Sequence, residues 1–308
     1  MQKPTRPSRA SPAPRGGAVR ARRKLTRAVL RGVWVAPADV YRKALQAALR
    51  RALAVLRALL RADVARRRDA VPDVALDGTR AAFAAYVAGR LRAEVSRIGK
   101  AIFGASKAAW ESAKRITKIK AASIAPGGQK QIDRFVRRNV DLISTVGERE
   151  IRKVENLVNG PGAGLHTKAL QARIQEETGA DDARAELWAR DQTLKLHAEI
   201  KETQARSAGM QRYRWNGATD AREREDHLLL EGRIFLFAQP PVTNASEVLK
   251  GKPARRENPG GDYQCRCAAE PIPDDETGAD LLPVTFDGHG FRRAQWSPGT
   301  PEETTGEE

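Results

Sequence analysis

The two cysteines of this 308-residue chain, Cys265 and Cys267, stand one residue apart in the stretch NPGGDYQCRCAAEPIP. A strand turns alternate side chains to the same face, so a strand through this stretch predicts both thiols on one side and Arg266 on the other. A disulfide between residues two apart is strained, which favours two reduced thiols. Two adjacent thiols can pack in a core, bind a metal or do redox chemistry.

A histidine and two carboxylates are the candidate companions of these thiols. His227 lies in an earlier segment that we expect to form a helical turn, with Asp220 and Asp226 close to it in sequence. Two thiolates, an imidazole and a carboxylate suit tetrahedral zinc, and zinc would stabilise a small module with a long loop. The candidate zinc ligands are therefore Cys265, Cys267 and His227.

Other interpretations of the thiols stay open at this point. The C-x-C spacing differs from the C-x2-C of zinc ribbons, and the residue types favour buried or hydrogen-bonded thiols in the core over a metal site. A redox or nucleophilic role is the third alternative.

Recognisable catalytic motifs are missing from the sequence. Its four histidines are widely separated, at positions 166, 197, 227 and 289, so we expect no base beside a nucleophile. The glycine-rich stretch NGPGAG, residues 159–164, has neither a preceding strand pattern nor a following Lys-Ser or Lys-Thr, which excludes a phosphate-binding loop. Asp220, Asp226 and His227 could hold a divalent metal for phosphodiester cleavage. The run DAREREDH is more typical of a capped, salt-bridged turn, and we predict that the chain is not an enzyme.

The positive charge is concentrated at the start of the chain. The net charge is +17, and residues 1–68 alone hold 19 Lys or Arg against Asp39 and Asp63, so the rest of the chain is neutral overall. A basic arm on a neutral body is typical of contact with a polyanion. We expect nonspecific DNA binding through six basic residues of this arm: Arg20, Arg22, Arg23, Lys24, Arg27 and Arg31.

The apolar pattern predicts long helices in the first two thirds of the chain. Leucines at 45, 49, 53, 56 and 60 form one stripe of a helix over residues 40–68. Similar stripes predict a helix from Phe83 through Trp110 to Ile124, with a kink near Gly104, and another from Ile132 to Val158. A short helix over 168–178 and a longer one from 181 to about 207 follow.

The pattern changes after Gly209 to short strands. We expect strands in QRYRWNG, RIFLFA and YQCRCAAEPI, with one or two helical turns in AREREDHLLLEG and a long loop before the last strand. The predicted fold class is therefore α+β, with a mainly α-helical N-terminal region and a small C-terminal α+β module of short antiparallel strands. No run of about 20 apolar residues is present to span a membrane, and the basic N-terminus lacks the apolar segment of a secretory signal.

Several spaced motifs resemble the phage Mu F-like head morphogenesis family, also called minor head or minor capsid proteins. They occur in family order in WARDQTLKLH (188–197), YRWNGATDAREREDHLLLEGRIF (213–235) and NPGGDYQCRCAAEPI (258–272). The matching positions are Arg190, Asp191, Gln192, Tyr213, Trp215, Asp220, Arg222, Arg224, His227, Gly232, Pro259, Gly260, Cys265, Arg266 and Cys267. We refer to these positions as the signature residues.

Composition and periodicity, with the resemblance for the third part, divide the chain into four parts, and the resemblance also implies a structural role. The parts are a disordered basic arm (1–36), a helical region (37–160), the Mu F-like head morphogenesis domain (161–273) and an irregular acidic tail (274–308). The implied role is a minor head protein of a tailed phage or prophage, inside the procapsid or virion after assembly in the host cytoplasm. Its partners would be the portal protein, the major capsid or scaffold proteins and DNA, with no membrane. The alternative is a DNA-binding protein outside virion assembly with a small metal-stabilised module.

Overall fold

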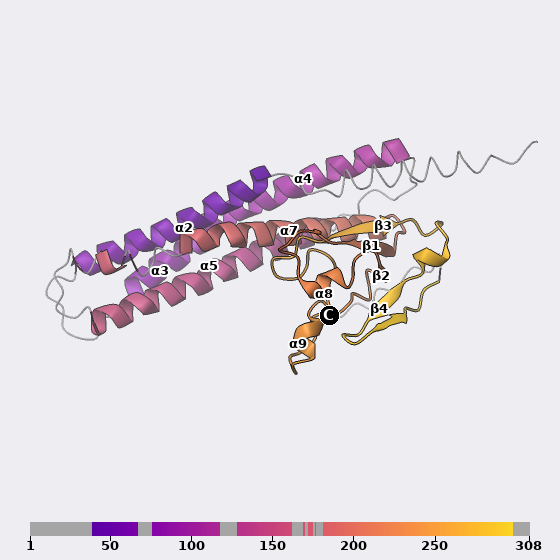
Figure 1. Ribbon diagram of the computed structural model, residues 1–308. Coiled ribbons are helices and arrows are strands. Elements are labelled where there is room, and N and C mark those ends of the chain that lie inside the picture. Colours follow the sequence, from indigo (N-terminus) through magenta and orange to yellow (C-terminus); the bar gives the residue numbers. More distant parts are fainter. Residues whose placement is uncertain are drawn as a thin grey trace, which may run out of the picture.

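The computed structural model describes residues 39–66, 76–117, 128–161 and 181–297, together with 169, 172–174 and 176. Its long helices lie side by side in an elongated bundle, and the strands gather at one end of it (Figure 1). The bundle helices are α2 (Asp39–Arg66), α3 (Asp77–Tyr86), α4 (Arg92–Thr117), α5 (Gly128–Asn159) and α7 (Asp181–Ser207). The α+β class, with helices first and short antiparallel strands after them, is confirmed. The expected basic arm, with Arg20, Arg22, Arg23, Lys24, Arg27 and Arg31, lies outside the described residues.

The predicted apolar stripes form the core of the bundle. The α2 leucines at 45, 49, 53, 56 and 60 are all at most 2% exposed. They pack with the stripes of α3, α4 and α5, including Phe83, Val95, Ile102 and Ile143, in one continuous core. Helical periodicity thus located both these helices and their buried faces. None of the described helices is long and apolar enough to cross a membrane.

The second predicted helix has an irregular stretch earlier than expected. A π-helical turn, Val87–Leu91, separates α3 from α4, whereas α4 continues through Gly104. Close packing explains a glycine on the neighbouring helix: a Cβ at Gly147 in α5 would lie 2.1 Å from the ring of Phe83. The bundle therefore needs a residue without a side chain at this contact.

The C-terminal module is built on a three-stranded antiparallel sheet in the order β2-β1-β3. The central strand β1 (Arg212–Asn216) pairs with β2 (Ile234–Leu236) and β3 (Ala268–Ile272). Two short helices, α8 (Glu225–Leu228) and α9 (Ala245–Val248), complete the module. Its core includes Tyr213 and Trp215 of β1, as well as Trp110 of α4, so the bundle contributes to the module core.

The cysteines lie just before β3 and not within it. The expected strand YQCRCAAEPI begins only at Ala268, and residues 261–267 form a turn and a loop. Gln264 has a left-handed backbone, with φ +54°, which a continuous strand cannot contain. The prediction that Cys265 and Cys267 lie in a strand, whose alternation would turn both thiols to one face, is therefore wrong.

The segment after Pro273 is also more regular than predicted. A 3-10 turn (Ala279–Leu281) precedes a hairpin of β4 (Val284–Phe286) and β5 (Phe291–Arg293). The buried guanidinium of Arg212 holds this segment, since it donates to the carbonyls of Leu281, Pro273 and Glu276. It also lies 3.7 Å from the ring centre of Trp296. The expected irregular tail is thus wrong for residues 279–293.

Candidate functional site

Helix α7 fixes the loop that carries the cysteines. The carboxylate of Asp191 accepts a hydrogen bond of 2.6 Å from the backbone N–H of Gln264. The Gln264 side chain donates to the Leu187 carbonyl and accepts from Arg190. These contacts hold the residue in its left-handed conformation. The Arg-Asp pair of the signature therefore positions the loop from 262 to 267.

Helix α8 brings His227 to the two thiols. Its Nδ1 lies 3.3 Å from Sγ of Cys267 and 3.7 Å from Sγ of Cys265. The ring of Trp215 stands edge-on against the imidazole, with centroids 5.5 Å apart. Cys265, Cys267 and His227 are all buried, and we call these three residues the Cys-His cluster. Among the described residues they are the group whose donor atoms could hold a metal ion.

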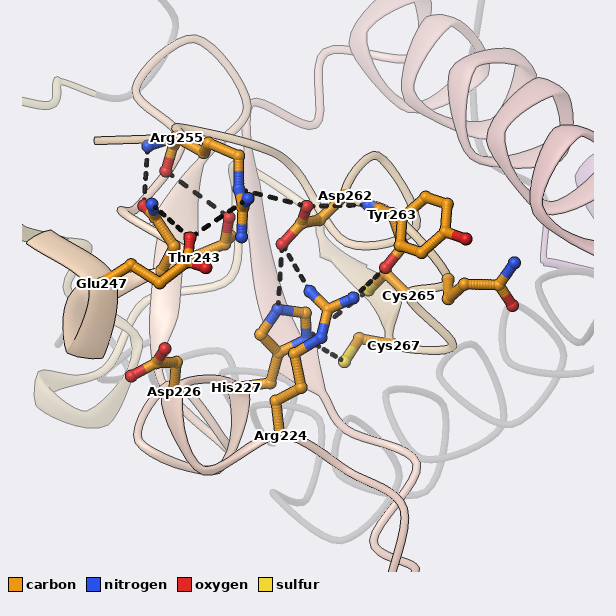
Figure 2. Close-up of polar contacts among 12 residues, drawn as sticks. Arg224, Asp226, His227, Thr243, Glu247, Arg255, Asp262, Tyr263, Cys265 and Cys267 are labelled. Atoms are coloured by element: carbon orange, nitrogen blue, oxygen red, sulfur yellow. Dashed lines mark hydrogen bonds and ion pairs between the residues drawn. The ribbon is translucent and has the colours of Figure 1, made fainter. Parts of the chain in front are cut away.

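Asp262, which the sequence motifs did not single out, lies beside Nε2, the other ring nitrogen of His227. Oδ2 of Asp262 lies 3.4 Å from Nε2 of His227 and accepts a 2.7 Å hydrogen bond from Arg224 (Figure 2). The other carboxylate oxygen accepts from the N–H of Tyr263 and lies 3.5 Å from Nε of Arg255. Burial raises the pKa of Asp262, but these donors outweigh burial and hold its pKa below the usual range. Asp262 is therefore a charged anchor for the imidazole.

The Cys-His cluster perturbs its own acid–base equilibria. The hydrogen bond with Cys267 and the proximity of His227 lower the pKa of Cys265 to about 5, although burial opposes this. The neighbouring Cys265 and burial raise the pKa of Cys267. Burial lowers the pKa of His227, but Asp262 and Cys265 raise it to a net value of about 9. In the absence of a metal, the arrangement favours a thiolate at Cys265 beside an imidazolium.

Two carboxylates expected near the histidine have other partners. Asp226 accepts hydrogen bonds from the N–H and hydroxyl of Ser246, and it is turned away from both cysteines in Figure 2. Asp220 pairs with Arg266 through two guanidinium nitrogens. This pairing holds the pKa of Asp220 below its usual range. The hypothesis that Asp220, Asp226 and His227 form a metal site for phosphodiester cleavage is therefore wrong.

Most remaining signature residues support the same small region. Tyr213 packs on Phe237 with ring centroids 4.7 Å apart. Gly260 has φ +86°, and a Cβ there would lie 2.8 Å from Ala198 of α7, so this close approach requires glycine. The others lie around them: Gln192 contacts Asp191, Arg222 is exposed near Asp220, Gly232 has a positive φ and Pro259 is buried.

The sequence motifs did not identify Asp262 and Glu223, nor the proximity of His227 to a potential nucleophile. Asp262 and Glu223 both face the Cys-His cluster, the latter with Oε1 3.5 Å from Sγ of Cys267. The expectation that no base lies beside a nucleophile is corrected by His227, which is 38 and 40 residues from the two cysteines. The aspartate in GGDYQCRC, three residues before Cys265, was the available signal for Asp262.

A cavity of about 880 Å³ lies between α5, α7 and the module, and Cys267 is among its lining residues. Its wall mixes cations such as Arg138 and Arg256 with anions such as Glu202 and Glu257, so charge alone selects no ligand. Burial lowers the pKa of Lys201, which lines the same cavity, to about 7.

Comparison with known proteins confirms the resemblance. Residues 152–270 match the family model described as Phage Mu protein F like protein. A protein of Haemophilus influenzae, described as "Uncharacterized protein", is 30% identical over 181 residues. That match covers 58% of this chain, and the chain spans 38% of the length of the relative. No solved structure matches the chain.

Proposed function

We propose, from the match of residues 152–270 to the phage Mu protein F family, that this chain is a structural minor head protein of a tailed phage or prophage. It acts in procapsid assembly near the portal and resides inside the procapsid. The match is the single observation that carries the proposal, and it covers the segment in which the signature residues converge.

The roles of the signature residues support a structural function. Asp191 and Arg190 hold a loop, Gly260 permits close packing, and Tyr213 fills the core. Although His227 lies beside two thiols, Cys265, whose pKa is lowered, is buried and is not among the residues that line the cavity. Cys267 lines the cavity, but its pKa is raised, which disfavours a nucleophilic thiolate. The arrangement therefore favours a domain that stabilises itself over one that turns over a substrate.

The elongated bundle and the charge distribution suggest how the chain is used. A helical body could contact the portal, the scaffold or the major capsid protein, while a basic arm could contact packaged DNA. Residues 1–68 carry the whole net charge of +17. Contacts to phosphate release counterions, so DNA binding would be independent of sequence and would weaken as salt rises.

Co-assembly tests the head role. The chain is co-expressed with the portal, scaffold and major capsid proteins of its own phage, and DNA-free particles are separated on a gradient at moderate salt. We expect the chain to sediment with procapsids, and a variant without residues 1–36 to do the same. A chain that stays at the top of the gradient and joins only DNA-filled heads would contradict an assembly role and favour the alternative DNA-binding protein.

DNA contact is tested separately by filter binding over a salt series. The full chain is compared with the variant lacking residues 1–36. We expect weaker binding and a smaller salt slope in the variant, because it lacks Arg20, Arg22, Arg23, Lys24, Arg27 and Arg31. Equal affinity and equal slope would refute a role for the arm.

A further inference from the structure

Three side chains, Cys265, Cys267 and His227, converge with the spacing of a tetrahedral metal site, and a fourth, Glu223, adjoins them. Zinc–sulfur bonds of about 2.3 Å and zinc–nitrogen bonds of about 2.0 Å place tetrahedral donors about 3.5–3.8 Å apart. Nδ1 of His227 lies 3.3 Å from one thiol and 3.7 Å from the other. Oε1 of Glu223 lies 3.5 Å from Sγ of Cys267. The separations within the Cys-His cluster are thus close to those of a metal centre, and Glu223 adjoins that cluster at Cys267.

The chemistry of the donor set calls for a cation. Two buried thiols face one imidazole, and the half-buried carboxylate of Glu223 contacts the thiol of Cys267. A carboxylate next to a thiol opposes formation of a thiolate and so hinders a nucleophile. The same carboxylate completes a ligand set of two sulfurs, one nitrogen and one oxygen, which suits a borderline-soft divalent ion.

Hydrogen bonds and ion pairs from neighbouring groups orient the proposed ligands, as supporting residues do in metal sites. Asp262 contacts Nε2 of His227 and thereby leaves Nδ1 facing the thiols. The N–H of Gly260 points to Sγ of Cys265 at 3.4 Å. The second carboxylate oxygen of Glu223 accepts from the N–H of Thr219. Each proposed ligand except Cys267 thus has a partner that orients it from outside the set.

We propose that Cys265, Cys267, His227 and Glu223 bind one structural Zn²⁺. The ion would join the α8 turn to the cysteine loop, which are some 40 residues apart in sequence. With four protein ligands the site would be closed, which is typical of structural and not catalytic zinc. This proposal does not depend on the role in phage heads, because it concerns only the folding of the module.

The first test uses the full chain purified under reducing conditions. We expect one zinc per chain by elemental analysis, or one after zinc is added to chelator-treated protein, with a higher Tm in the metal-bound form. Co²⁺ added to the chelator-treated protein should give the intense visible bands of a tetrahedral site and a thiolate-to-cobalt charge-transfer band. Failure to bind either ion at one equivalent would overturn the proposal.

Variants then assign the ligands. Cys265→Ser together with Cys267→Ser should abolish the charge-transfer band, and Glu223→Gln should weaken Co²⁺ binding and change the visible bands. Asp262→Asn should weaken binding about 10–100-fold, as losses of supporting residues do. The matched controls are Glu225→Gln, an exposed carboxylate of the same turn, and His289→Ala, an exposed histidine.

The partly exposed Glu223 keeps the test decisive if the double cysteine variant does not fold. Glu223→Gln must then bind Co²⁺ more weakly than Glu225→Gln while showing a native circular dichroism spectrum. Equal affinity in these two variants would overturn the assignment of Glu223. Retention of zinc by a folded double cysteine variant would overturn the whole site.

Discussion

Replacement of Asp191 by alanine tests whether α7 holds the cysteine loop. Asp191 is 4% exposed, and it accepts a 2.6 Å hydrogen bond from the N–H of Gln264. It also pairs with Lys195 at 3.0 Å. Alanine removes the acceptor and leaves the left-handed loop residue without its anchor. We expect the loop to loosen while the bundle stays folded.

The size of the effect follows from the contacts that are lost. A hydrogen bond to a charged group contributes about 1.5–3 kcal/mol, and the partly exposed ion pair adds less than about 1 kcal/mol. We therefore expect Asp191→Ala to lower the free energy of unfolding of the module by about 2–3 kcal/mol. Glu186→Ala on the same helix removes only an exposed ion pair with Arg42 and should cost less than about 1 kcal/mol.

Two measurements check this prediction. Urea unfolding followed by tryptophan fluorescence gives the free energy, since Trp215 packs against His227 beside the loop. The rate of thiol labelling of chelator-treated protein reports on exposure of Cys265 and Cys267. Asp191→Ala should unfold at lower urea and label faster than Glu186→Ala. If the two variants match in both measurements, the proposed anchoring of the loop is wrong.

Three further predictions concern packing, the last segment and pH. Gly147→Ala should destabilise the bundle by about 1–3 kcal/mol through overpacking. Gly104→Ala, with nothing within 4 Å of its Cβ, should stabilise the bundle by about 0.5–1 kcal/mol. Thermal melts of the two variants should therefore shift in opposite directions. Arg212→Met should leave carbonyl acceptors unpaired and speed proteolysis of residues 279–293, which limited trypsin digestion followed by mass spectrometry detects. The hydrogen bond from Arg80 lowers the pKa of Glu148. The contact therefore contributes under about 1 kcal/mol to folding stability above the normal carboxyl pKa, and this contribution is lost as pH falls through the lowered pKa of the folded state. Urea midpoints measured across acidic pH should therefore fall less in Arg80→Met than in the parent chain.

The bundle was predictable because its signal is local. Stripes such as Leu45 to Leu60 repeat at helical spacing, and the same residues are buried. The π-helical turn at Val87–Leu91 was not predictable, since it depends on how α3 and α4 pack against the neighbouring helices.

The candidate site was predictable in its residue types but not in its geometry. The motifs singled out Cys265, Cys267 and His227, and the structure brings them together. The partners Asp262 and Glu223 were missed because acidic residues are common in these segments, and only the fold selects which ones face the thiols. The order of the segment after Pro273 was missed because Arg212, which holds it at Pro273 and Leu281, lies about 60–70 residues earlier in the chain.

X-ray absorption at the zinc edge of the purified full chain tests the structural role of the cysteine loop most directly. A site made of Cys265, Cys267, His227 and Glu223 predicts two sulfur neighbours at about 2.3 Å and two nitrogen or oxygen neighbours at about 2.0–2.2 Å. One tightly bound zinc per chain with this first shell would support the proposed centre. A spectrum with only nitrogen and oxygen neighbours, or a chain that takes up no zinc, would contradict it.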